Sequence, residues 1–311
     1  MTLKEQNRLY NAAKKIAMTY RNRPGIVDID FGIKRVNNAQ KEDLAIRFKI
    51  NKKVSLDLLN PKDVFPKMIN GYLTDVIEVD SEFHGTWVKP SELTRPSVGG
   101  NQIVEKTWVE TDFHGTLGCL FPLEGKVLGI TNYHTLYGDL DSDTVSTDFV
   151  GKAKVYQNCS DKEVISIGLS HEAYDVDLDY ATILLDKDLF SDAYTYEFKA
   201  FTSSITAMPI SEIKLGETKV RKSGIGKTIT YGIADGRSLL NPSVITIYED
   251  INRPSVKGHI SRLGDSGSVW IVDEPSDQIR VVALNSGSQE PHSAFGNSFD
   301  VIIKSIQEKS N

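Results

Sequence analysis

From about residue 102 to residue 284, the sequence is a succession of short apolar segments with the length of β-strands and no helical period between them. Chains with this pattern form β-barrels or β-sandwiches, because many short strands bury their apolar faces only when sheets close or stack. The clearest segments are residues 126–131, 153–157, 180–185, 244–248, 268–272 and 281–284. This part of the chain is therefore predicted to be mainly β, with a helical period returning at residues 300–307.

The N-terminal part of the chain has a different pattern. Apolar residues such as Leu9 and Ile16 recur at helical spacing up to about Arg21, and a break follows at residues 23–25. Alternating segments then predict strands at residues 26–31, 44–50 and 73–79. We therefore predict a small α+β domain at residues 1–85, a linker rich in Pro and Gly at residues 86–100, and the mainly β domain at residues 101–311.

Charge and cysteine content exclude several classes of protein. The 36 Lys and Arg residues against 42 Asp and Glu residues give a net charge of −6, which argues against nucleic acid as the main partner. Only two cysteines are present, Cys119 and Cys159, whereas a secreted protein of this kind would carry several pairs. The charged N-terminal segment lacks the apolar core of a signal peptide, and no apolar run reaches the roughly 20 residues that span a bilayer. We expect a cytoplasmic protein without a membrane span.

No motif predicts a cofactor. His171-Glu172 is not followed by a second histidine at metalloprotease spacing, and the two cysteines lack the spacing of zinc ligands. The segment Gly224-Ile225-Gly226-Lys227-Thr228 is similar to a phosphate-binding loop, but Arg221 stands where that motif needs glycine. We therefore expect neither a metal ion nor a nucleotide.

The strongest chemical signal is Gly264-Asp265-Ser266-Gly267-Ser268, directly before the apolar segment 269–272. A nucleophilic serine needs its hydroxyl at a sharp turn and backbone N–H groups aimed at the developing oxyanion. Glycines on both sides allow unusual backbone dihedrals and close approach of a substrate. The alternative is an ordinary Gly/Ser turn between two strands.

Two earlier segments supply partners for such a serine. An apolar strand ends at Thr131-Asn132-Tyr133-His134, and a lone histidine there is either structural or a general base. Asp179 opens the segment 180–185, which is apolar on both faces, and a buried carboxylate needs a partner such as an imidazole N–H. On spacing alone Asp175 and Asp177 could serve as well, but the Asp-x-Ala-x-x-Leu sequence favours Asp179.

The order of His134, Asp179 and Ser266 within its GDSG motif resembles that of the chymotrypsin-like serine proteases. More narrowly, the chain resembles the cytosolic trypsin-like proteases related to the plant Narrow Leaf protein and their bacterial relatives. The matching motifs are Gly115-Thr116-Leu117-Gly118-Cys119-Leu120, Thr131-Asn132-Tyr133-His134, Val220-Arg221-Lys222-Ser223-Gly224 and the GDSGS segment. Tyr133 and Thr135 beside the histidine, and Gly226-Lys227-Thr228, depart from that pattern.

This resemblance implies a double β-barrel protease domain and a set of roles. Ser266 would be the nucleophile, His134 the general base, and Asp179 the residue that orients the histidine. The N–H groups of Gly264 and Ser266 would form the oxyanion hole, each donor contributing about 3–4 kcal/mol. Ile260 would lie at the base of the specificity pocket, which favours an apolar or small residue before the cut. A substrate strand would pair with Leu284, Asn285 and Ser286.

The function expected from these roles is hydrolysis of peptide bonds in protein or peptide substrates through an acyl-enzyme intermediate. In secreted relatives the aspartate matching Asp265 pairs with a newly cleaved N-terminus. No activation site is evident here, so Asp265 is expected to bond local backbone. Control would then come from an activating partner or from homo-oligomers. By analogy with the bacterial members of this subgroup, the expected role is that of a triggered effector protease in stress or phage defence.

Two other functions stay open at the level of sequence. The chain is a latent protease-fold scaffold if its N-terminal domain only recruits partners. It is an esterase if the same three residues act on another acyl group, although the order His-Asp-Ser differs from that of α/β-hydrolases.

Overall fold

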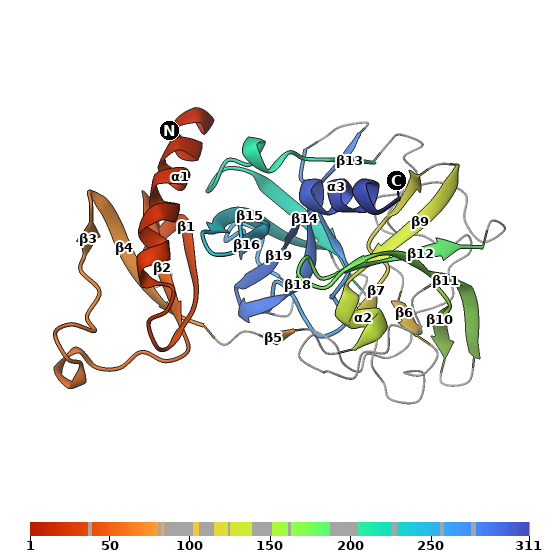
Figure 1. The fold of residues 1–311 in the computed structure, drawn as a ribbon, viewed down its shortest axis with the longest axis horizontal. Coiled ribbons are helices and arrows are strands. Elements are labelled where there is room, and N and C mark those ends of the chain that lie inside the picture. Colours follow the sequence, from red (N-terminus) through yellow and green to blue (C-terminus); the bar gives the residue numbers. More distant parts are fainter. Residues whose placement is uncertain are drawn as a thin grey trace.

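A computed structural model gives the structure of the chain. It describes residues 1–36, 39–79, 82–83, 102–105, 115–123, 125–138, 151–160, 163–186, 205–224, 229–255, 258–274 and 278–310. The predicted linker at residues 86–100 lies outside these ranges. The fold is mainly β, as predicted, with one sheet of seven strands and one of twelve (Figure 1).

The seven-stranded sheet forms the first barrel. Its strand order is β7-β6-β10-β11-β12-β9-β8. Residues 115–123 close this barrel, because they pair with β6 at their start and with β9 at their end. Buried Ile103, Leu117, Val155 and Ile183 fill its interior. The elements are β6 (Gln102–Glu105), β7 (Gly115–Thr116), β8 (Leu120–Leu123), β9 (Lys126–Thr131), α2 (Tyr133–Tyr137), β10 (Lys154–Ser160), β11 (Glu163–Asp175) and β12 (Tyr180–Leu185).

The second barrel belongs to the twelve-stranded sheet. Six strands run in the order β14-β17-β18-β19-β16-β15, and pairing of β14 with β15 closes the ring. Its core includes the buried residues Val220, Ile247, Trp270 and Val282. The elements are β13 (Ile205–Ala207), a 3₁₀ turn (Ile210–Glu212), β14 (Lys219–Ser223), β15 (Ile229–Ser238), β16 (Val244–Glu249), β17 (Val269–Val272), β18 (Ile279–Glu290) and β19 (Ser293–Ser298).

The C-terminal helix α3 (Phe299–Ser310) connects the two barrels. Its buried residues Phe299, Ile302 and Ile306 belong to one apolar cluster with residues of both barrels, among them Ile130 and Ile271. Such burial contributes roughly 2 kcal/mol for each large side chain. The helix therefore holds the barrels in a fixed relation, which matters because residues from both build the candidate site.

The N-terminal segments continue the second barrel rather than hanging from it (Figure 1). The C-terminal half of β15 pairs with β1 through Asp30 with Ser238, Phe31 with Arg237 and Gly32 with Gly236. The larger sheet then proceeds through β2 and β4 to β3. The elements are α1 (Leu3–Tyr20), β1 (Ile26–Val36), β2 (Ala39–Ile50), a 3₁₀ turn (Leu56–Leu58), β3 (Met68–Ile69), β4 (Tyr72–Glu78) and β5 (Glu82–Phe83).

Buried charged side chains fasten β1 and β2 to the barrel. The guanidinium of Arg47 donates to both carboxylate oxygens of Asp30, at 2.6 and 2.7 Å, and also bonds Asp235 on β15. Lys49 lies 2.9 Å from Asp30, and Arg35 lies 2.6 Å from Asp235. We call these five residues the charge cluster. Each carboxylate in it faces two cations, which satisfies charges that would otherwise be costly to bury.

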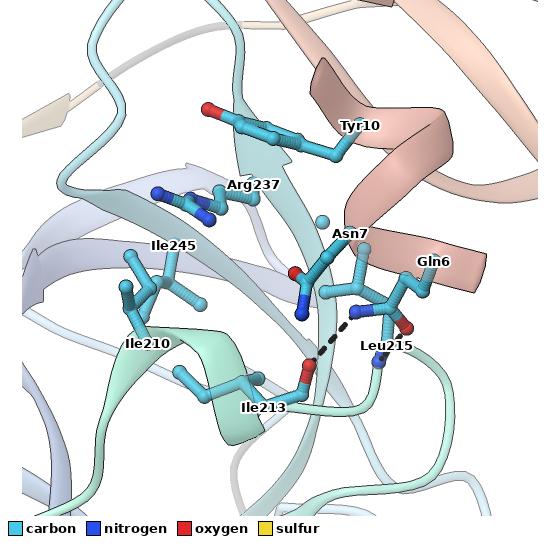
Figure 2. Close-up of a pocket in the computed structure, with 9 residues that line it drawn as sticks. Gln6, Asn7, Tyr10, Ile210, Ile213, Leu215, Arg237 and Ile245 are labelled. Carbon is cyan, nitrogen blue, oxygen red and sulfur yellow. Dashed lines mark hydrogen bonds between the residues drawn. The ribbon is translucent and has the colours of Figure 1, made fainter. Parts of the chain in front are cut away.

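Helix α1 also docks on the second barrel. The Gln6 amide donates to the carbonyl of Ile213 at 2.8 Å and accepts from the N–H of Leu215 at 2.9 Å (Figure 2). The Tyr10 hydroxyl donates to the Ser238 carbonyl at 2.6 Å. The cavity between these residues has a volume of only about 10 Å³, so this contact is closely packed. In the described part of the chain, no helix has the length and apolar character needed to cross a bilayer.

Candidate active site

Three side chains that the sequence singled out meet between the two barrels. His134 lies in the first turn of α2, directly after β9, and Asp179 immediately precedes β12. Both come from the first barrel, whereas Ser266 precedes β17 of the second. The pairing of β9 with β12, through Thr131 and Ala181, brings the histidine and the aspartate together.

Hydrogen bonds join these three side chains in one line. The Nδ1 atom of His134 lies 2.9 and 3.0 Å from the two carboxylate oxygens of Asp179. On the other side of the ring, Nε2 lies 2.8 Å from the Ser266 hydroxyl oxygen. The backbone N–H of His134 also donates to Asp179, at 3.2 Å. With Nδ1 protonated, Nε2 has a lone pair directed at the serine hydroxyl, which is the arrangement a general base needs.

Asp179 adopts an unusual backbone conformation. Its φ of 46° lies in the left-handed region, which costs a non-glycine residue energy but is tolerated best by Asp and Asn. The buried side chain of Asn132 donates to the Asp179 carbonyl at 2.8 Å and also lies 3.4 Å from the Ser286 hydroxyl. Asn132 therefore links the turn at Asp179 in the first barrel to Ser286 on β18 of the second. Sequence reasoning missed this role, although Asn132 belongs to the motif that ends in His134.

The turn that carries Ser266 depends on its glycines and on the first barrel. Gly264 and Gly267 have φ values of 88° and 86°, which glycine adopts without strain. A Cβ on Gly267 would overlap the Thr116 carbonyl. Thr116 itself donates its N–H to the Ser266 carbonyl and its hydroxyl to the Gly264 carbonyl, both at 2.7 Å. The Gly115–Leu120 motif of the first barrel thus fixes the serine turn of the second.

The backbone N–H groups of Gly264 and Ser266 have no acceptor among the described residues. Buried N–H groups normally find a partner, so a pair left open beside a serine hydroxyl is a place for an external acceptor. The Ser266 residue is itself fully buried. Two N–H groups without an acceptor are one requirement of the predicted oxyanion hole, and the assignment stays a prediction.

Asp265 bonds local backbone, as predicted, since it accepts from the N–H of Arg262 at 3.1 Å. Asp265 has a second partner that was not predicted from the sequence. The buried Lys222 ammonium lies 2.6 Å from the Asp265 carboxylate, and Gly224 leaves the space that the carboxylate occupies. An internal lysine thus neutralises Asp265. The signal in the sequence was that Lys222 stands two residues after Val220, on the face of β14 that the alternation predicts to be buried.

No known protein-family profile matches the chain, and no curated protein matches it in sequence. Solved structures do resemble it. A glutamic-acid-specific serine protease is 13% identical with a TM-score of 0.44, and the match covers 67% of this chain and 96% of that one. Thermobifida fusca protease A is 11% identical with a TM-score of 0.42, over 67% and 94%. A Nocardiopsis protease is 13% identical with a TM-score of 0.41, over 68% and 96%. At this level of identity the likeness concerns the fold alone.

The described strands form two β-barrels, which meet where Asp179, His134 and Ser266 come together. In that frame the other predicted site residues are placed as follows. Ile260 is buried in the apolar core of the second barrel, and its N–H donates to the Pro291 carbonyl at 2.9 Å. The Ser286 carbonyl accepts from the Ser266 hydroxyl at 3.1 Å.

The prediction that a substrate strand pairs along Leu284, Asn285 and Ser286 needs correction. Leu284 pairs with Val269 on β17 and with Asn297 on β19, so both of its edges are occupied. Asn285 exchanges hydrogen bonds with Gly267 and Ser268 at 3.0 and 2.8 Å. The segment that carries β17 pairs with this edge of β18 only as far as Asn285. The edge that a substrate strand can use therefore begins at Ser286.

The two other aspartates that the sequence allowed in the role of Asp179 have different surroundings. Asp175 accepts from the N–H of Leu178 at 3.0 Å and pairs with Lys309 at 2.8 Å, while Asp177 is exposed.

Cys119 is buried, and burial raises the pKa of its thiol. Within the ranges described, no group of three or more His, Cys, Asp or Glu side chains is arranged to hold a metal ion.

Proposed function

We propose that the protein is a serine endopeptidase that hydrolyses peptide bonds through an acyl-enzyme intermediate. The observation that carries this proposal is the line of hydrogen bonds from Asp179 through His134 to Ser266. A serine hydroxyl is a weak nucleophile unless an adjacent base takes its proton, and His134 Nε2 is placed to do so.

In the first step, the Ser266 oxygen attacks the carbonyl carbon of the scissile bond while its proton passes to His134. The Asp179 carboxylate holds the imidazole in the required tautomer and stabilises the imidazolium that forms. The N–H groups of Gly264 and Ser266 donate to the oxyanion. The imidazolium then protonates the leaving amine, and water hydrolyses the ester of Ser266 by the same route in reverse.

The finer parts of the proposal follow the sequence. The motifs support membership of the cytosolic trypsin-like subgroup of Narrow Leaf-like proteases. By analogy with that subgroup, the proposed enzyme acts on protein or peptide substrates in the cytoplasm as a triggered effector. Ile260 favours cuts after apolar or small residues. Digestion of a peptide library, with the cut sites read by mass spectrometry, tests this preference, and cuts mainly after Lys or Arg would contradict it.

The proposed function is tested with a fluorophosphonate probe and intact-mass measurement. We expect one covalent addition to the wild type and none to Ser266→Ala. Ser211→Ala is the matched control, because Ser211 is exposed and lies on the 3₁₀ turn contacted by α1, and it should label like the wild type. Equal labelling of Ser266→Ala, or none of a folded wild type, would refute the assignment.

A further inference from the structure

The chain already holds a strand at the edge of β18 that lies next to Ser266. Strand β5 pairs antiparallel with β18, with Phe83 opposite Gly287 and Glu82 opposite Ser288. On its other edge β18 pairs with β19 at the same residues, through Phe295 and Ala294. β5 therefore occupies the edge that β17 leaves when its segment ends at Asn285.

This edge is the one that faces the proposed nucleophile. The residue between the β17 pairing and the β5 pairing is Ser286, whose carbonyl accepts from the Ser266 hydroxyl at 3.1 Å. Because Glu82 faces Ser288 and Phe83 faces Gly287, β5 runs along β18 toward Ser286. A peptide that adds to this edge as a strand would need the same backbone groups. Two strands cannot pair with one edge at once.

The geometry also keeps β5 close to this edge. Strand β5 directly follows the elements α1 to β4, which we call the N-terminal unit. This unit is fastened to the second barrel by the β1–β15 pairing and by the charge cluster. A tethered segment competes at an effective concentration that reaches the millimolar range. The proposed site is closed in this arrangement, since Ser266 is fully buried and His134 is only 4% exposed.

We propose that β5 is an intramolecular competitor of substrate at the Gly287–Ser288 edge of β18. This inference rests on the proposed function of Ser266. A substrate strand, or a partner that draws the N-terminal unit aside, must displace β5 before the edge is free. An edge that is free only one tenth of the time weakens apparent substrate binding roughly tenfold.

The test is a double variant, Glu82→Pro with Phe83→Pro. Successive N–H groups of an antiparallel strand point to opposite sides, so this variant removes the N–H that faces β18 whichever of the two residues carries it. With a coumarin-linked tetrapeptide that carries leucine before the reporter, we expect KM to fall roughly tenfold and kcat to stay unchanged, because the edge becomes permanently free. The matched control is Val54→Pro, in an exposed loop of the same unit, which should leave KM unchanged.

Fluorophosphonate labelling separates this inference from the function beneath it, because the small probe requires no strand pairing. Labelling of wild type and double variant with an unchanged KM would overturn the competitor alone. No labelling of either protein would overturn the proposed function and this inference with it. Hydrogen exchange gives an independent measure. A peptide boronate bound at Ser266 should speed the exchange of the β5 amide that faces β18, and continued protection of that amide would contradict displacement.

Discussion

The charge cluster and the candidate active site both bury polar side chains, and they differ in how their charges are balanced. In the charge cluster, Asp30 faces Arg47 and Lys49, and Asp235 faces Arg35 and Arg47. At the candidate active site, Asp179 forms no ion pair with any Lys or Arg of the described residues, and among those same residues its carboxylate accepts from His134 alone. A carboxylate that faces two cations stabilises the fold. A carboxylate without such a cation is available to stabilise a positive charge that appears beside it during a reaction.

The same substitution in both groups separates these two uses of a buried carboxylate, and its largest expected effect is on rate. Asp179→Asn keeps the shape of the side chain but favours the wrong imidazole tautomer, so peptide hydrolysis should slow by about 10⁴-fold. The free energy of unfolding should change far less than in the next variant. Retention of wild-type turnover would remove Asp179 from the mechanism.

In the charge cluster the effect should fall on stability. Asp30→Asn leaves Arg47 and Lys49 with less opposing charge, and breaking a buried pair in this way costs about 3–5 kcal/mol. Urea denaturation measures this loss, and fluorophosphonate labelling of the folded variant should match that of the wild type. Glu212→Gln is the control, because its pair with Arg280 is partly exposed and should contribute less than about 1 kcal/mol. A loss no larger than that of the control would show that the charge cluster does not stabilise the attachment of β1 and β2 to the second barrel.

The smallest effect comes from pH. Burial raises the pKa of Asp30, but Arg47 and Lys49 outweigh it and lower the pKa from 3.8 to about 2. The stabilisation from this ionised group is therefore complete above about pH 4 and is lost as the pH falls toward 2, an effect of about 2 kcal/mol. Urea midpoints between pH 5 and pH 2.5 should converge for wild type and Asp30→Asn. Parallel curves would contradict this assignment.

The sequence predicted the parts of the fold that rest on apolar periodicity. The segments at residues 126–131 and 180–185 match β9 and β12 residue for residue. β15 and β19 were not singled out, because Gly232, Asp235 and Gly236 interrupt the first and the second is short and polar. Those residues serve contacts with other strands, and a single sequence does not display such partners.

The candidate site was predictable where chemistry dictates the residue type. His134, Asp179 and Ser266 were found from motifs and order, and the structure brings them together. Asn132 and Lys222 were missed because each acts on a turn distant in sequence. The pairing of β5 with β18 could not be predicted, since two residues carry no strand signal of their own and their pairing depends on the whole fold.

The facing glycines of β1 and β15 have a consequence for assembly. Gly32 and Gly236 lie opposite each other, and a Cβ on either would overlap the Arg47 guanidinium. The side chain thus passes through a gap that exists only where two residues without side chains coincide. A slip of one residue would put Phe31 or Ile33 opposite Gly236 and shut that gap. The β1–β2 pair can therefore join β15 in one register only, because a shifted register leaves no space for the Arg47 side chain.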